Sequence, residues 1–434
     1  YHDQAHALKG MLKDGSVSSR SLWEHSPQLA RAVAPVWAIS PYEIASLDPR
    51  QRWDIVVLVD AGAITVAEAA PSIARGTQVV AFGDPITDHP VGFTITPDDA
   101  SHRTLGSISI LSRLADYLPT HALTQSYRTL GNDLSASINH HLYSGGVRSW
   151  TLAASALGVE GIAIENVHGT RMPDEVTGRV EAPDSEVIAV VRRVLEHARH
   201  HPEQSLMVIS PSPVHVSRIH DAVLAAIPVN RDLQEFLANS DLEPFVVLTL
   251  DQASAVTRDR VIVSLGYGKT PHGRILSDLG PLATADGERL VAVAVTRAHS
   301  HLRVITSLSP SDLTIDRMAP GPRMLGRFID DTLAYTPPTA APNPLLEDLG
   351  SRLEARGVTV LPATSDIPLA AVRGQRTIAI DTDDVLTGLS LRSGIRMRPA
   401  TLARFGWGYV RVHTLELFMN PDSVADRIVA MLDE

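Results

Sequence analysis

Short, uninterrupted apolar runs alternate along the chain with segments of helical periodicity. Because the runs are rich in β-branched residues and do not alternate with polar ones, they predict strands that are covered on both faces. They occupy residues 54–59, 79–82, 206–209, 245–250, 260–265 and 302–306. The pattern therefore predicts an α/β fold built on parallel sheets.

The clearest helical pattern covers residues 185–200. Its apolar positions fall on one stripe and its charged positions on the other, which predicts an amphipathic helix packed on the core. The apolar positions are Val187, Val190, Val191, Val194, Leu195 and Ala198. Near the C-terminus the pattern predicts a helix that ends at Gly406, a strand over residues 408–413 and a helix from Asn420.

Two breaks divide the chain into three expected domains. A hinge is expected near residues 117–125, and the stretch YTPPTAAPNP at 335–344 carries four prolines that exclude helix and central strand. We therefore expect domains over residues 1–118, 119–334 and 345–434, with 335–344 as the linker.

Composition and charge exclude several classes of protein. The 434 residues include no cysteine, which excludes disulfides and thiolate metal sites and fits a cytoplasmic location. No apolar run is long enough to cross a bilayer, so no membrane partner is expected. The net charge of −11 means that any binding to nucleic acid must depend on a local basic track. Tyr1 begins no signal-peptide pattern, and the chain is expected to be part of a longer one.

Acidic residues follow the first two predicted strands. Asp60 ends one strand, and Gly83 and Asp84 end the next. Because the carboxyl ends of parallel strands face the ligand crevice of an open sheet, Asp60 and Asp84 are candidates to face a nucleotide and its Mg²⁺. The alternative is that both simply begin turns, where Asp and Gly are favoured.

Thr296 and Arg297 lie between two apolar segments further along the chain. An arginine fixed beside a packed element can present its donors to a transferring phosphate, as an arginine finger does. The alternative is a surface arginine next to His299 and His301. Metal binding by those two histidines is not expected, since they are two residues apart without acidic neighbours.

Seven segments in order resemble superfamily 1 DNA and RNA helicases, in the up-frameshift-like branch. They are VWAISPYEIA, DIVVLVDAGAI, VVAFGDPITDHP, SYRTLGNDLSASINHHLYSGGV, the helix at 185–200 with SLMVIS, TLDQASAVTRDRVIVSL and VAVTRAHSHL. The resemblance implies two RecA-like domains, the first incomplete, with ATP and Mg²⁺ as cofactors. It also implies single-stranded nucleic acid bound across the top of both domains.

Several family residues are replaced in this chain. The family has Asp-Glu where this chain has Asp60 and Ala61, and the missing acid positions the attacking water. Thr87 stands where the family has a phosphate-sensing glutamine. Arg128 and Arg297 occupy the positions of the arginines in the fourth and sixth motifs.

The phosphate-cradling loop has no counterpart in the sequence, since G-x-x-x-x-G-K-[ST] does not occur. In the family that loop precedes these motifs, so it is expected upstream of Tyr1 if the protein has one. The resemblance assigns ATP contacts to Gly83, Asp84, Arg128 and Arg297, and metal or catalytic roles to Asp60, Arg128 and Arg297. It assigns nucleic-acid phosphate contacts to Thr249, Ser264 and Thr296.

Residues 401–434 resemble the end of a very-short-patch-repair-like restriction endonuclease domain. Such nucleases hold Mg²⁺ with acidic residues on two strands. Asp381 and Asp383 in TIAIDTDD match the second strand, whereas Pro368 occupies the position of the first aspartate and Asp366 lies two residues earlier. The alternative is an acidic loop in a purely structural domain.

Three functions remain open at this point. The first is a helicase-like nucleic-acid-binding protein with degenerate ATPase motifs, inactive as this chain alone, in DNA repair, recombination or defence. The second is part of an active ATP-dependent helicase. The third is a non-catalytic scaffold. The expected partners are single-stranded DNA and either other subunits or the N-terminal part of the same chain.

Overall fold

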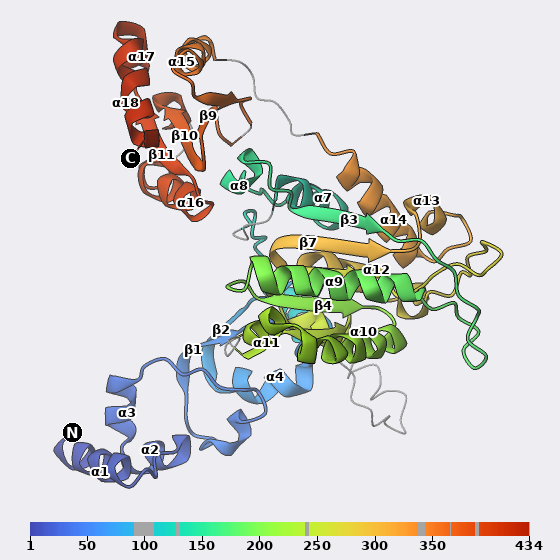
Figure 1. Cartoon of the computed structure of the whole chain (residues 1–434). Coiled ribbons are helices and arrows are strands. Elements are labelled where there is room, and N and C mark those ends of the chain that lie inside the picture. The colour runs from blue at the N-terminus through green and yellow to red at the C-terminus, as the bar shows by residue number, and fades with distance from the viewer. Residues whose placement is uncertain are drawn as a thin grey trace. The chain divides into compact units, whose positions relative to one another are not determined.

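The computed structural model describes residues 1–90, 108–126, 131–238, 243–336, 343–364, 366–386 and 390–433 (Figure 1). It divides into two compact units, Tyr1–Ala122 and Leu123–Glu434. The three domains expected from the sequence stay a prediction. No described helix is long and apolar enough to span a membrane.

The first unit centres on a two-stranded parallel sheet. Strands β1 (Trp53–Leu58) and β2 (Gly76–Ala81) are joined by helix α4 (Val66–Ile73), whose N-terminus carries a capping box between Thr65 and Glu68. The other elements are α1 (His2–Lys13), α2 (Ser19–His25), α3 (Pro27–Val33), η1 (Ile44–Ser46) and α6 (Ile110–Ala115). One expectation fails here, because Ile55 and Val57 on β1 are 53% and 52% exposed. Among the described residues, this strand is therefore not covered on both faces.

The second unit contains a five-stranded, all-parallel sheet in the order β3-β7-β6-β4-β5. Its strands are β3 (Ile162–Asn166), β4 (Leu206–Ser210), β5 (Val246–Thr249), β6 (Arg258–Ser264) and β7 (Ala298–Thr306). The α/β class with parallel sheets, as expected for RecA-like domains, is confirmed. The strands predicted from apolar runs are confirmed too, whereas β3 was missed.

Helices surround this sheet in two groups. The first packs on the apolar core of the sheet and consists of α9 (Asp184–His200), α10 (Pro213–Ala226) and α11 (Arg231–Ala238). The second consists of α7 (Asn132–Tyr143), α12 (Gly287–Thr296) and α14 (Pro320–Leu333). The predicted stripe of α9 is confirmed, because Val190 and Val194 are fully buried. The short elements are α8 (Ala153–Ala156), η2 (Ile227–Val229), η3 (Gln252–Ala255), η4 (Gly280–Ala283) and α13 (Pro310–Leu313).

The C-terminal part of the second unit has its own mixed sheet, in the order β11-β10-β9-β8. Strand β10 is parallel to β11 and antiparallel to β9. The strands are β8 (Thr359–Leu361), β9 (Leu369–Arg373), β10 (Arg376–Thr382) and β11 (Gly408–Val412). The helices are α15 (Pro344–Glu354), η5 (Asp383–Leu386), the π-helix η6 (Arg392–Met397), α16 (Arg398–Arg404), α17 (Thr414–Met419) and α18 (Pro421–Asp433).

An apolar cluster ties this C-terminal part to the segment around α8. Trp407 donates a hydrogen bond from its indole nitrogen to the Thr151 carbonyl at 2.6 Å, and the Ala153 amide donates to the Phe405 carbonyl at 3.0 Å. Trp150 packs against the same cluster. Because these contacts combine burial with satisfied backbone groups, they hold α8 against the small sheet.

Two glycine backbones touch where α7 begins and β3 starts. A Cβ at Gly161 would lie 2.5 Å from the Gly131 Cα, and the Asp133 carboxylate accepts the amides of Gly161 and Ile162 at 3.2 Å each. We expect Gly161→Ala to destabilise the second unit by roughly 1–3 kcal/mol, since the backbones would have to separate. Gly350→Ala is the matched control, because its Cβ would meet only ordinary contacts at 3.4 Å or more. Urea unfolding that ranks the two variants equally would contradict this packing.

Candidate functional site

The loop after β2 is closed by hydrogen bonds among its own side chains. The Asp84 carboxylate accepts the Ile86 amide and the Thr87 hydroxyl, each at 2.9 Å. The Asp88 carboxylate accepts the Asp84 amide at 2.8 Å. Thr87 is 2% exposed. Its hydroxyl therefore fixes the loop internally, in the position where the family has a glutamine.

The end of β1 packs tightly against this loop. Asp60 is exposed and takes a left-handed backbone conformation with φ of 53°. The next residue, Ala61, is 0% exposed and packs with Leu58 and Ala69, and its amide donates to the Phe82 carbonyl at 2.8 Å. A glutamate side chain at position 61 would have to enter this apolar cluster.

Asp88 is a third carboxylate at this edge that the sequence analysis missed. Burial raises the pKa of its carboxyl, and the negative charges of Asp84 and Asp60 raise it further. These three carboxylates do not form a metal-binding cluster. Among the described residues, the only group of three or more such side chains with ligand atoms within 4.8 Å of one another is His140, His141 and Asp331. The metal role of Asp60 stays a prediction.

Ser264 lies at the carboxyl end of β6, inside a buried polar network. Its hydroxyl donates to Glu186 at 2.8 Å and lies 2.8 Å from Nε2 of His215. The Gly266 amide also donates to Glu186 at 2.8 Å. All three side chains of the network are 0% exposed. In this conformation the Ser264 hydroxyl is therefore engaged within the protein, and its predicted contact with nucleic acid would require rearrangement.

The network holds two groups with strongly shifted acidity. Burial raises the pKa of Glu186 to about 7, against hydrogen bonds that lower it. Burial lowers the pKa of His215 to about 3, with Arg218 and Arg171 adding to the effect. Because the carboxylate bonds the serine rather than the free ring nitrogen of His215, the three residues do not form the relay of a hydrolase triad.

The other residues to which the resemblance assigns phosphate or ATP contacts differ in their burial and in their hydrogen bonds. Thr249 ends β5, where its amide donates to the Gln252 side chain at 3.0 Å. Thr296 is buried and donates to the Ala292 carbonyl at 2.7 Å. Arg297, 7% exposed, donates to the Ser254 carbonyl and to the Thr296 hydroxyl. Arg128 lies outside the described residues. The arginine-finger and phosphate-contact roles stay predictions.

Arg398 occupies the predicted metal position of the C-terminal part. Its guanidinium binds both oxygens of the fully buried Asp381, at 2.5 and 2.8 Å. It also donates to the Asp366 carbonyl and stacks over the Trp150 ring, 5.3 Å from its centroid. Asp383 instead accepts the amide and hydroxyl of Thr414, where α17 begins. Both predicted metal ligands therefore have protein partners.

Arg398 lies within a basic segment that was not predicted from the sequence. Residues 390–413 contain five arginines and no acidic residue, in a chain of net charge −11. Arg392, Arg396 and Arg404 are exposed along η6 and α16. The signal was present in the charge pattern, as an acid-free stretch between Asp384 and Glu416. Any binding of nucleic acid by a chain of this net charge would depend on a local basic track, and this segment has that composition.

Comparison with known proteins assigns the chain to no family. No family model matches the chain, and no curated protein matches it. The C-terminal domain of a possible DNA helicase from Lactobacillus plantarum WCFS1 is similar over 46% of this chain and 94% of its own length, with 12% identity and a TM-score of 0.24. Arterivirus nonstructural protein 10, a helicase, is similar over 70% of this chain with 15% identity and a TM-score of 0.28.

The chain covers 56% of that arterivirus protein. Both TM-scores are below 0.5, so the α/β fold class rests on the strand pairing described above.

Proposed function

We propose that the chain is a helicase-like nucleic-acid-binding protein whose ATPase motifs have become structural, with a role in DNA repair, recombination or defence. The burial of Ala61 is the observation that carries the proposal. Where the resemblance requires an acid that activates water, the side chain is a methyl group inside an apolar cluster. A methyl group cannot orient or deprotonate water.

Two further contacts support the loss of chemistry. The Thr87 hydroxyl is bonded to Asp84, so the loop after β2 is fixed without a phosphate. Arg398 neutralises Asp381, so a positive charge stands where a nuclease would hold Mg²⁺. In this proposal ATP and Mg²⁺ bind weakly at Asp60, Gly83 and Asp84, and the C-terminal part binds nucleic acid without cutting it.

The exposed arginines of η6 and α16 provide the binding surface in this proposal. Guanidinium groups bind phosphates through two parallel hydrogen bonds. Binding releases the counterions condensed on the nucleic acid, so the affinity depends on the salt concentration. Arg392 and Arg396 are four residues apart on η6. Single-stranded DNA is the proposed partner, and RNA is a comparison arm of the test.

The test is the salt dependence of oligonucleotide binding. We expect affinity for single-stranded DNA to fall as salt rises. In the double variant Arg392→Gln, Arg396→Gln the slope of log K against log salt should shrink by roughly 1 to 2. Arg199→Gln with Arg231→Gln is the matched control, because these exposed arginines lie on α9 and α11. The proposed surface would be refuted if the affinity did not depend on salt. It would also be refuted if the control variant weakened binding as much as the double variant of Arg392 and Arg396 does.

A further inference from the structure

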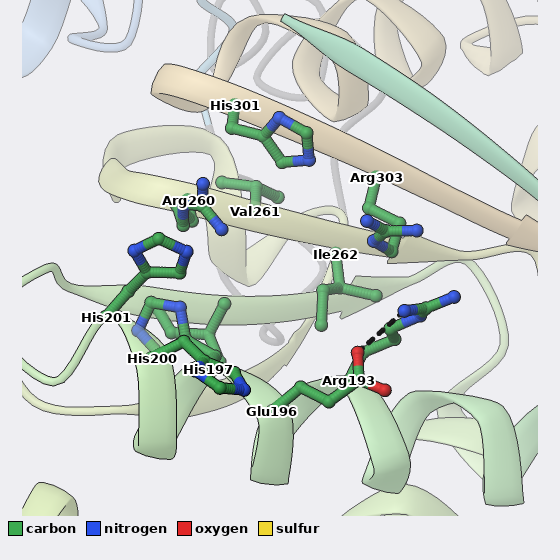
Figure 2. Close-up of a pocket in the computed structure, with 11 residues that line it drawn as sticks. Arg193, Glu196, His197, His200, His201, Arg260, Val261, Ile262, His301 and Arg303 are labelled. Carbon is green, nitrogen blue, oxygen red and sulfur yellow. Dashed lines mark hydrogen bonds and ion pairs between the residues drawn. The ribbon is translucent and has the colours of Figure 1, made fainter. Parts of the chain in front are cut away.

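A pocket of about 180 Å³ opens between the C-terminal half of α9 and the strands β4, β6 and β7 (Figure 2). Arg260 on β6 is directly paired with His301 on β7, and Ile262 with Arg303. These residues alternate along their strands, so they share the sheet face that α9 covers. The pocket lies toward the strand starts, away from the carboxyl ends where open α/β sheets bind nucleotides.

Basic side chains outnumber acidic ones in the lining. Three arginines and four histidines line the pocket with a single carboxylate, that of Glu196. The lining residues are Arg193, Glu196, His197, His200, His201, Leu206, Arg260, Val261, Ile262, His301 and Arg303. Figure 2 shows the α9 side chains on one side of the pocket and Arg260, His301 and Arg303 on the other. Such a lining attracts an anion.

Arg260 is the arginine without a carboxylate. Arg193 is bound to Glu196 and Glu165, each at 2.6 Å, and Arg303 lies 3.4 Å from Glu165. Among the described residues Arg260 forms no ion pair, and its Nε is buried without a hydrogen-bond partner. Burial and the neighbouring Arg303 lower the pKa of Arg260. A buried guanidinium nitrogen without a partner is costly, and an anion that accepts its hydrogen bond would remove that cost.

Two buried ring nitrogens also lack partners. His197 is 5% exposed, and its Nε2 lies 2.8 Å from the Gln204 carbonyl, which leaves Nδ1 without a hydrogen bond. His301 has the reverse arrangement, with Nδ1 3.0 Å from the Glu160 carbonyl and Nε2 unpartnered. Since a carbonyl only accepts, each ring donates to it, and the free nitrogen becomes a donor only when the ring is protonated.

These histidines do not form a metal site. Among the described residues, their ligand atoms are not part of any group gathered closely enough to hold an ion. The guanidinium groups beside them would also repel a cation.

We propose that this pocket binds a small phosphate-bearing or sulfate-bearing anion, held by Arg260 and by the ring nitrogens of His197 and His301. The anion accepts hydrogen bonds from the guanidinium and from the protonated rings. The site is separate from the nucleic-acid surface proposed above, and it does not depend on that surface.

Binding is coupled to proton uptake. Burial lowers the pKa of both His197 and His301 to about 4, so the rings are neutral near pH 7 in the empty pocket. The carbonyls of Gln204 and Glu160 favour protonation of the rings that they bind, and the carboxylates of Glu203 and Asp133 add to this. Arg260 opposes protonation of both rings, as do His201 at His197 and Arg303 at His301. A bound anion raises both pKa values, so its affinity increases as the pH falls.

Calorimetric titration with sulfate tests the proposal, because sulfate keeps its charge across the range from pH 8 to pH 6. We expect binding to strengthen toward pH 6, by up to about tenfold per unit for each proton taken up. Arg260→Gln should weaken binding roughly tenfold or more. Glu165→Gln should strengthen it, since it removes the carboxylate that pairs with Arg303 and one of the two that pair with Arg193. Arg231→Gln, an exposed arginine on α11, should change nothing.

Parallel titrations distinguish the sources of the anion. Inorganic phosphate and adenosine 5′-monophosphate should both bind, and adenosine should not. Circular dichroism of each variant checks that it is folded. The proposal is overturned if sulfate and phosphate fail to bind at millimolar concentration, or if folded Arg260→Gln binds them as well as the unmodified protein does.

Discussion

Acidification from pH 7 to pH 5 is expected to lower the free energy of unfolding of the second unit by roughly 3 kcal/mol. Burial lowers the pKa of His197 and His301 to about 4 and that of His215 to about 3. In the unfolded chain they titrate near 6.5. Between pH 6.5 and 4 the unfolded state therefore binds more protons, and stability is lost as the pH falls.

Glu186 acts in the opposite direction. Because burial raises its pKa to about 7, the folded state holds its proton between pH 4.5 and 7 while the unfolded state releases it. This carboxyl therefore stabilises the fold as the pH falls through that window, and it offsets part of the loss from the three histidines. The net effect on the free energy of unfolding is still a loss, because three histidines destabilise the fold on acidification and one carboxyl stabilises it.

Hydrogen exchange of β4 and β6 at pH 7 and pH 5, corrected for the intrinsic rate, measures this loss within the second unit. His197→Leu should reduce the pH dependence, since one of the three rings is removed. His220→Leu, at an exposed position on α10, is the control for the loss of a histidine. Equal or greater protection at pH 5 would show that the buried rings are protonated in the folded state.

Arg398→Met is expected to destabilise the second unit by about 3–5 kcal/mol, because it leaves the fully buried Asp381 charged and unpaired. The double variant Asp381→Asn, Arg398→Met should recover much of this loss, since neither partner is then charged. Arg404→Met is the control, because Arg404 is exposed on the same helix, α16. Urea unfolding of the unmodified protein, Asp381→Asn, Arg398→Met and the double variant gives the coupling free energy.

Magnesium provides a second readout for the same pair. With Arg398 bound to both oxygens of Asp381, we expect Mg²⁺ to leave the stability of the unmodified protein unchanged. A Mg²⁺-dependent rise in the unfolding temperature that Asp381→Asn abolishes would show that Asp381 binds the metal. Equal stability of Arg398→Met and Arg404→Met would show that the ion pair contributes nothing.

The sequence predicted the elements better than it predicted their surroundings. Buried strands such as β4 and β6 contain continuous apolar runs, and these runs can be recognised in the sequence without knowledge of the tertiary packing. Strand β3 was missed because its run is short and ends in Glu165 and Asn166. Its position is set by pairing with β7, which follows more than a hundred residues later.

Side-chain partners could not be predicted, because they depend on tertiary packing. Asp60 and Asp84 were correctly expected at strand ends. Asp88 joins them at this edge of the sheet only because the turn after β2 places it beside Gly62. Ser264 was expected to be available at a strand end, and the Glu186 carboxylate that binds it comes from a helix 78 residues earlier. The pairing of Arg398 with Asp381 joins two elements that no local pattern relates.

ATP hydrolysis tests the loss of chemistry most directly. It should be measured on this chain with and without single-stranded DNA. We expect no turnover above background in either condition, and Asp60→Asn should behave like the unmodified chain. We also expect Ala61→Glu to destabilise the first unit instead of restoring activity, because position 61 is buried among apolar side chains. Hydrolysis that is stimulated by DNA and abolished by Asp60→Asn would contradict the proposal that these motifs have become structural.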